Sequence, residues 1–177
     1  MRGKPAAVVA FAALSLAGAP ASAGDLRSKI INSPTIFRAW GTEAEWRKDS
    51  EVQGGQALRI TTTGKERNLH DVGVYSPVDG AVKAGDRLIL AFWARVERSE
   101  DGTGRALLPN NVIQVASPPF RPVVRGGATL SSKWEVHQVT GVADRDYAPG
   151  ELSIGLQLAS GKQVVDIGPV FAYDLGQ

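Results

Sequence analysis

Residues 86–98, DRLILAFWARVER, constrain the fold more than any other part of the chain. The apolar residues recur with the period of two that places alternate side chains on opposite faces of a β-strand. The face with the features of a core consists of Leu88, Leu90, Phe92, Ala94 and Val96. The other face carries Trp93 beside Arg95, a pair found both in ordinary packing and on sugar-binding surfaces.

Shorter runs of β-branched and apolar residues fill most of the remaining chain, separated by Gly, Pro, Asp and Asn. This pattern is typical of an all-β sandwich. It predicts strands at residues 35–39, 57–63, 72–78, 87–97, 111–116, 135–143, 151–158 and 164–175. In LSIGLQLA, residues 152–159, the leucines and Ile154 should face inward, with Ser153, Gly155 and Gln157 outward. Residues 42–51 lack a second apolar row and predict at most one short helical turn.

The first 23 residues have the features of a secretory signal peptide. Arg2 and Lys4 precede an apolar run over residues 6–19, followed by Pro20 and three small residues. The run is short for a membrane anchor, and no other segment could span a bilayer, so we expect no membrane insertion. Cleavage after Ala23 would leave residues 24–177 as a single secreted or periplasmic domain. With no cysteine, that domain would have no disulfide.

Removal of the signal peptide would also balance the charge. The chain has 20 basic and 18 acidic residues, and Arg2 and Lys4 would be lost with the leader. A neutral domain without a basic patch gives no reason to expect binding to nucleic acid. An uncharged polymer is a more suitable ligand.

The sequence carries no recognisable catalytic motif. The two histidines, His70 and His137, have no metal-ligand spacing, and His137 is expected to point outward from its strand. A Gly-x-Ser-x-Gly nucleophile elbow is absent. Glu97, Glu135 and Asp166 lie in predicted strands without further signature, so a glycosidase pair could arise only through folding. We expect no enzyme activity, with a glycoside hydrolase as a minor alternative.

Four segments in order carry a resemblance to a known family. They are GGQALRI (54–60), GDRLILAFWARVE (85–97), SSKWEVHQVTGVA (131–143) and ELSIGLQLASGKQVVDIGPVFAYDLG (151–176). Together they resemble the jelly-roll carbohydrate-binding modules of families four, nine and twenty-two, especially the type found beside bacterial xylanases. The resemblance implies a galactose-binding-like, two-sheet antiparallel sandwich whose concave sheet binds a polysaccharide such as xylan, and a structural calcium ion in many members. A separate glycoside hydrolase is a further expected partner.

Six strand residues are predicted to contact carbohydrate, because aromatic rings pack on the C–H face of a sugar while amides and Arg bond its hydroxyls. They are Tyr75, Trp93, Arg95, Asn111, Gln114 and Gln157. For Trp93 and Arg95 an alternative stays open: Trp93 could pack beneath a loop while Arg95 pairs with a carboxylate. Trp134 is assigned to packing, and Trp40 and Trp46 fit either the core or a groove.

The chain differs from the family pattern at His70, and alternatives remain for Asp166 and for the function. Relatives often have a tryptophan where this chain has His70, which would weaken binding. Asp166, in the last predicted strand, is assigned to calcium together with Asp49 from the loop before residue 57. The alternative for Asp166 is an exposed edge carboxylate. The main alternative function is a periplasmic structural module whose concave face binds protein.

Overall fold

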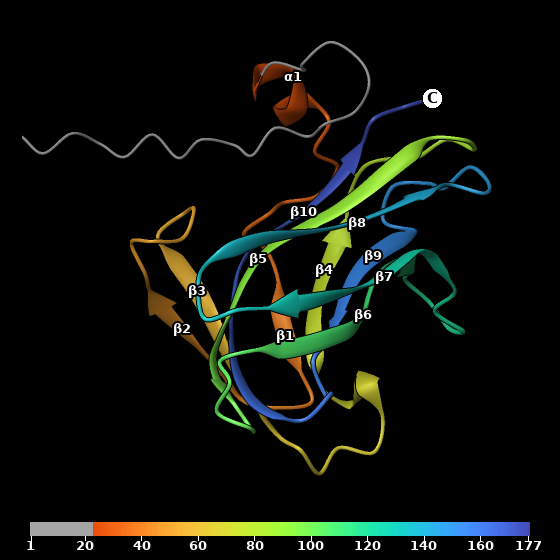
Figure 1. Ribbon diagram of the computed structural model, residues 1–177. Helices are drawn as coiled ribbons and strands as arrows, with labels where there is room; N and C mark the ends of the chain where they lie inside the picture. Colours follow the sequence, from red (N-terminus) through yellow and green to blue (C-terminus); the bar gives the residue numbers. More distant parts are fainter. Residues whose placement is uncertain (1–22) are drawn as a thin grey trace, which may run out of the picture.

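The computed structural model describes residues 23–177, and the predicted signal peptide lies outside them except for Ala23. Two five-stranded antiparallel sheets form the molecule (Figure 1). Sheet A runs in the order β2 (Ala44–Lys48), β3 (Gln56–Thr63), β10 (Lys162–Asp174), β5 (Arg87–Ser99) and β8 (Glu135–Val142). Sheet B runs β1 (Arg38–Trp40), β4 (Gly73–Val78), β9 (Leu152–Gln157), β6 (Ala106–Val115) and β7 (Pro122–Leu130). The predicted all-β, two-sheet architecture is confirmed.

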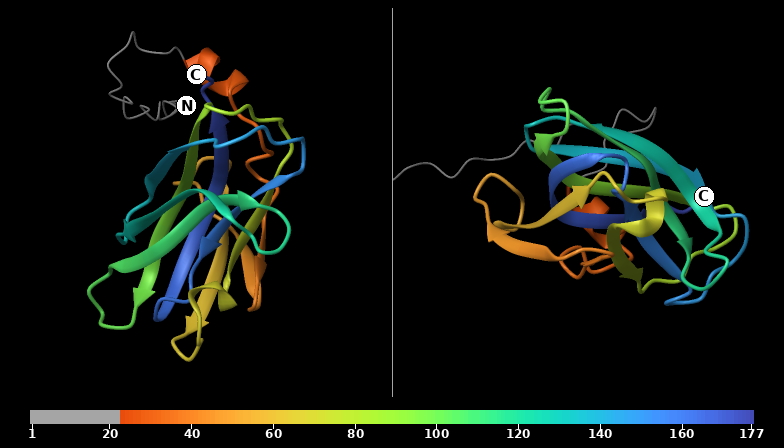
Figure 2. Two further views of the ribbon diagram at one scale, coloured as in Figure 1. Left: turned by 90° about the vertical axis from the view of Figure 1, so that its right-hand side faces the viewer. Right: turned by 90° about the horizontal axis from the view of Figure 1, so that it is seen from below.

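Two short helices accompany the sheets. They are α1 (Ala23–Ser28) and the 3-10 helix η1 (Leu69–Asp71). Neither of these helices of residues 23–177 has the length and apolar composition needed to cross a bilayer. The segment after α1 pairs with the end of β10 through Ile30 and Tyr173, so α1 and the C-terminus lie at the same end of the molecule (Figure 2).

The core lies between the sheets and follows the predicted alternation. Leu88, Leu90, Phe92, Ala94 and Val96 of β5 are all buried, as are Leu152, Ile154 and Leu156 of β9. Complete burial of one large apolar side chain stabilises the folded state by roughly 1.5–3 kcal/mol. These two rows therefore supply much of the force that holds the sheets together.

The two edges of the sandwich differ. At one edge β7 of sheet B lies against β8 of sheet A, where a Cβ on Gly126 would approach the Val139 side chain to 2.6 Å. At the opposite edge, the ring of Phe37, which precedes β1, lies 5.1 Å from that of Trp46 in β2. At this second edge the Phe37 and Trp46 rings lie between the two sheets.

Two strands were not predicted. All five residues of β2 are exposed, because this edge strand pairs with β3 alone and buries no row of its own. The helical turn expected at residues 42–51 is therefore wrong. The other missed strand, β7, begins at Pro122 and contains Gly126 and Gly127, residues that usually weaken strands. The first predicted strand, 35–39, is shifted to Arg38–Trp40.

The predicted outward orientation of His137 is also wrong. His137 lies directly opposite Phe92 on the neighbouring strand, and the two rings are 5.5 Å apart. Because paired residues share a face of a sheet, the imidazole points toward the interior with Phe92. Burial lowers the pKa of His137, and its Nε2 has no hydrogen-bond partner among residues 23–177.

Candidate carbohydrate-binding face

The strand registers arrange the outward side chains of sheet B in three rows that run across the strands. The residues between them, such as Val74, Ile154 and Ile113, face the core. The first row is Trp40, Gly73, Gln157 and Asn110; the second is Arg38, Tyr75, Gly155, Val112 and Arg125; the third is Pro77, Ser153 and Gln114. The outer face of sheet B thus combines aromatic rings, amides and two arginines.

The first row contains an indole that lies directly on the backbone. A Cβ on Gly73 would come within 2.4 Å of ring carbons of Trp40, so only glycine allows this approach. The Trp40 Nε1–H donates to the carbonyl oxygen of His70 at 2.8 Å, which fixes the ring plane. Gln157 lies beyond Gly73 in the same row. The row therefore presents a fixed aromatic surface beside an uncharged amide.

The second row pairs a ring with a cation. The Arg38 guanidinium lies 5.3 Å from the centre of the Tyr75 ring. Gly155 follows Tyr75 in the row and has no side chain, and Val112 beyond it is only 2% exposed. The middle of the face is therefore lower than its Tyr75 side, and a pocket of about 530 Å³ lies next to it. That pocket is lined by Thr35, Ile36, Phe37, Arg38, Tyr75 and Pro77.

Two polar atoms on this face lack partners. Ser153 is 1% exposed and Asn110 is 8% exposed, yet Ser153 Oγ and Asn110 Oδ1 have no hydrogen-bond partner among residues 23–177. A buried polar atom left without a partner costs about 1–3 kcal/mol, and native proteins normally satisfy it with protein, water or ligand. Both residues belong to rows that also carry glutamine amides. Because both atoms are buried, a ligand on this face could reach them only if neighbouring side chains moved.

The six residues predicted to contact carbohydrate separate into three groups. Tyr75, Gln114 and Gln157 share the outer face of sheet B. Asn111 is on the same sheet but points inward: it is fully buried, and its Nδ2 donates to the carbonyl oxygens of Leu108 and Gly126 at 3.0 and 3.2 Å. The irregularity in β6 between Leu108 and Asn111 shifts the alternation there and brings Asn110 to the face instead.

Trp93 and Arg95 form the third group, on the outer face of sheet A. The loop between β2 and β3 covers this region, because Val52 lies against Gly168 of β10. The Trp93 Nε1–H donates to Gln53 Oε1 of the same loop at 3.2 Å. Arg95 contacts the carboxylates of Asp49 and Asp166. These contacts correspond to the packing alternative for both residues, and they lie on the opposite side of the molecule from Tyr75.

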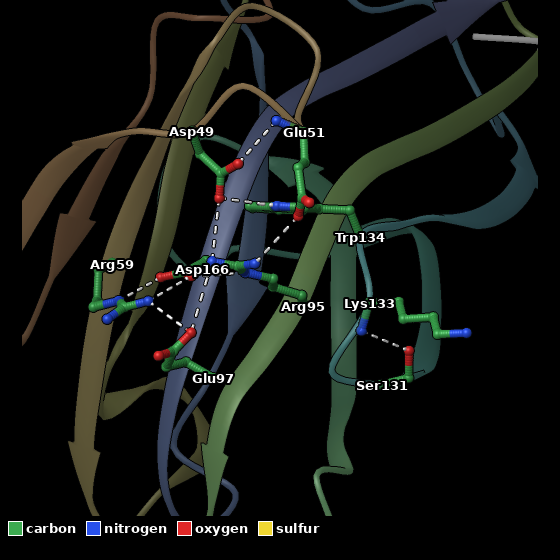
Figure 3. A network of polar contacts seen from close by, with 9 residues as sticks. All are labelled: Asp49, Glu51, Arg59, Arg95, Glu97, Ser131, Lys133, Trp134 and Asp166. Atoms are coloured by element: carbon green, nitrogen blue, oxygen red, sulfur yellow. Dashed lines mark hydrogen bonds and ion pairs between the residues drawn. The ribbon is translucent and has the colours of Figure 1, made fainter. Parts of the chain in front are cut away.

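A network of ion pairs occupies the centre of this second face (Figure 3). The Asp166 carboxylate, whose side chain is 3% exposed, accepts hydrogen bonds from Arg59 Nε at 2.7 Å and from Arg95 Nε at 3.0 Å. Burial opposes ionisation of Asp166, but the two guanidinium groups outweigh it and lower the pKa of this carboxyl group. Asp166 is therefore not the exposed edge carboxylate considered as an alternative.

Asp49 belongs to the same network. Its Oδ2 lies 3.1 Å from Arg95 Nη2 and accepts a hydrogen bond from the Trp134 indole at 3.1 Å. The Arg95 guanidinium also lies 5.1 Å from the Trp134 ring. Trp134 thus packs on the outer face of sheet A rather than in the core between the sheets.

The arrangement of Asp49 and Asp166 does not fit a calcium ion held between them. Arg95 lies between the two carboxylates and contacts both. Arg59 also donates a hydrogen bond to Asp166 Oδ2. Calcium prefers six to eight oxygen ligands, whereas here the groups in contact with the two carboxylates are N–H donors: Arg59 and Arg95 at Asp166, and Arg95, Trp134 and the Glu51 backbone at Asp49. The charge that a calcium ion would supply at Asp166 is supplied by two guanidinium groups.

Several residues of the sheet B face were not singled out from the sequence. The sequence pattern leaves Trp40 undecided between core and groove, and it does not indicate Arg38, Asn110, Ser153 or Arg125 as contact residues. The alternation around Ile154 already placed Ser153 outward, so this residue could have been found. The others depend on strand β7, the shifted strand β1 and the irregularity in β6.

Comparisons with known proteins support the fold. No protein-family model matches the chain, and no curated protein matches it. Among solved structures, a family 4 carbohydrate-binding module is similar with a TM-score of 0.60 and 17% identity, over 80% of this chain and 96% of the other. The CBM22-1 xylan-binding domain of Paenibacillus barcinonensis has a TM-score of 0.55 and 14% identity, over 84% and 93%.

A third structure has the same architecture. The N-terminal cellulose-binding domain of β-1,4-glucanase C from Cellulomonas fimi is similar with a TM-score of 0.57 and 17% identity, over 83% of this chain and 93% of that domain. The predicted resemblance to jelly-roll carbohydrate-binding modules is therefore confirmed for the fold.

Proposed function

We propose that this protein binds a neutral, β-linked polysaccharide on the outer face of sheet B without chemically changing it. The observation that carries the proposal is the combination of an indole fixed over Gly73 with the amide side chains of Gln157 and Gln114 on the same face. An aromatic surface beside uncharged amides is complementary to a sugar ring, which has C–H groups on its faces and hydroxyls on its rim.

The composition of the face supports an uncharged ligand. Its rows carry the amides of Gln157, Asn110 and Gln114, each able to donate and to accept. Arg38 and Arg125 can donate to hydroxyls at either side of the face. The strand positions of these rows hold amides, arginines and aromatics where a glycosidase would need a facing pair of carboxylates. This composition favours binding over hydrolysis.

The ligand class is narrowed by the structural likeness. Two of the similar structures are described as xylan-binding and cellulose-binding domains. We infer that this chain binds a β-1,4-linked plant polysaccharide of the xylan or glucan type, and that it serves a separate glycoside hydrolase acting on the same polymer. A face of this kind is shallow and buries little of each sugar, so affinity should be weak.

Export is part of the same proposal. A polysaccharide of this type lies outside the cell, and the predicted leader, residues 1–23, would direct the chain to the periplasm or the medium. The exported protein is expected to begin at Gly24. The calcium ion implied by the family resemblance is not needed at Asp166, where Arg59 and Arg95 already balance the charge.

The test is affinity electrophoresis in native gels that contain xylan, β-glucan, pectin or chitin. The wild-type protein should be retarded by xylan or β-glucan, and Trp40→Ala should reduce the retardation about tenfold or more, because a stacking surface is lost. Trp40→Phe keeps an aromatic ring and should restore most of the binding. Val142→Ala changes an exposed apolar residue of sheet A and serves as the control. Unchanged migration of the wild-type protein in all four gels would refute the proposal.

A further inference from the structure

A second pocket, separate from the three rows, lies at the edge of the sandwich where β1 and β2 are neighbours. Its volume is about 290 Å³. The segment before β1 forms one side of it, and β2 with the turn into β3 forms the other. The lining residues are Thr35, Phe37, Trp46, Gln53, Gly54, Gln56 and Pro169. None of these side chains carries a charge.

The pocket has an aromatic wall. Trp46 is 47% exposed, whereas Phe37 beneath it is 8% exposed. Their ring centres are 5.1 Å apart and the rings are tilted by 51°, so Phe37 supports the indole from one side. Trp46 pairs with Leu58, a core residue, and therefore lies on the inner side of sheet A at its very edge. An indole in this position covers the core on one side and offers the rest of its surface to a ligand.

Free hydrogen-bonding groups surround this wall. Gln53 Oε1 accepts a hydrogen bond from the Trp93 indole, which orients the side chain and leaves its amide NH₂ group without an acceptor in the part of the chain that the structure describes. The side chains of Gln56 and Thr35 likewise make no hydrogen bond with any described residue. Three uncharged polar groups and a half-exposed indole thus converge on one small cavity.

We propose that this pocket is a second saccharide site, which binds one ring of a neutral sugar. The proposal rests on the proposed function for the class of ligand, but it concerns different residues. Trp46 would stack on the C–H face of the ring, and Gln53, Gln56 and Thr35 would bond its hydroxyls. Small-molecule sites usually measure about 300–1,000 Å³, so a cavity at the lower limit suits a single ring rather than a chain.

The two sites are neighbours. Thr35 and Phe37 line both this pocket and the pocket beside Tyr75. A polysaccharide bound at both places would be held at two points, and the second contact would form at a high local concentration. Avidity for the polymer should therefore exceed affinity for a short oligosaccharide.

Residue-resolved NMR titration of the isotopically labelled protein tests this assignment, with xylotetraose and cellotetraose as probes. The expected result is two sets of shifted signals with separate saturation curves. One set should include Gln157 and Gly155, and the other should include Gln53, Gly54 and the Trp46 indole N–H. Trp46→Ala should reduce the affinity reported by the second set of signals about tenfold or more and leave the affinity reported by the first set unchanged. Trp46→Phe should retain the affinity reported by the second set.

Arg47→Ala is the matched control, because Arg47 follows Trp46 on the same exposed strand and points to the other face. Shifts confined to the sheet B residues would overturn the second site and leave the proposed function intact. Shifts confined to the edge pocket would support the second site and overturn the sheet B face. The absence of both sets with both probes would overturn both proposals. Should Trp46→Ala fail to fold, Gln56→Ala replaces it, with a smaller expected loss of affinity in the second set.

Discussion

Asp166 shows how two guanidinium groups can stabilise a buried carboxylate. Its neighbours on the adjacent strands, Arg59 and Arg95, reach it from both sides because β10 lies between β3 and β5. Desolvation of a buried ion is costly, and these two hydrogen-bonded partners offset that cost. The sequence could indicate that an acid in VVDIGPV needs a partner. It could not show which partner, since Arg59 and Arg95 are distant in the chain.

The first prediction concerns the stability contributed by this residue. Asp166→Asn should lower the free energy of unfolding by about 3 kcal/mol, because two guanidinium groups would lose their buried counter-charge. Because the folded-state pKa of Asp166 is lowered, its contribution is present at neutral pH and is lost as pH falls below the ordinary value of 3.8. Urea denaturation at pH 7 and at pH 3 should therefore show a smaller difference between variant and wild type at pH 3. Glu97→Gln, in the same network but 42% exposed, should change stability by less than about 1 kcal/mol.

At the scale of the elements, most of the fold follows from alternation of apolar residues. Strands β5 and β9 are readily predicted since each buries a full row of one face. By contrast, β2 has no buried row and β7 has a proline and two glycines, so both depend on pairing with a neighbour. Because of the irregularity in β6, Asn110 lies on the outer face of sheet B and Asn111 points inward. A shift of one residue is enough to misplace a predicted contact residue.

Gly73 gives the second prediction, because it decides the position of an indole. A Cβ there would lie 2.4 Å from the Trp40 ring and 2.4 Å from the carbonyl oxygen of Leu156. Gly73→Ala should therefore destabilise the protein by about 1–3 kcal/mol and displace Trp40, which should also weaken polysaccharide binding. Thermal unfolding and affinity electrophoresis measure the two effects. Gly127→Ala in β7, where the nearest atom would be 3.5 Å away, should leave both measurements close to wild type; an equal loss in both variants would contradict this explanation.

At the scale of the whole molecule, the charges are arranged in local pairs. Sheet A carries the Arg59, Arg95 and Asp166 network, and other pairs, such as Arg121 with Asp144 and Arg145 with Glu151, lie in the loops. The three rows on the face of sheet B instead carry amides, aromatic rings and the two arginines Arg38 and Arg125, and none of their residues is a carboxylate. The sequence predicts this distribution of charge only in part. Composition shows that acidic and basic residues balance, but it does not show which face carries the ion pairs.

The third prediction follows from this separation. Binding of a neutral polysaccharide should change by less than about twofold between 0.05 and 1 M NaCl, because salt screens interactions between charges and not stacking or uncharged hydrogen bonds. Isothermal titration calorimetry with soluble xylan or β-glucan at several salt concentrations measures this. A steep loss of affinity with salt would instead assign the binding energy to Arg38 and Arg125 and indicate an acidic ligand.

The position of the chain ends has a practical consequence. Asp174 N–H donates to the carbonyl oxygen of Lys29 at 2.9 Å, so the last strand and the segment after α1 leave the sandwich together. The η1 turn next to Trp40 lies at the far end of the molecule (Figure 1). A tag or linker added after Gln177 would therefore emerge remote from the indole, and protein immobilised through that tag would keep its sugar-facing side accessible in a surface-based assay.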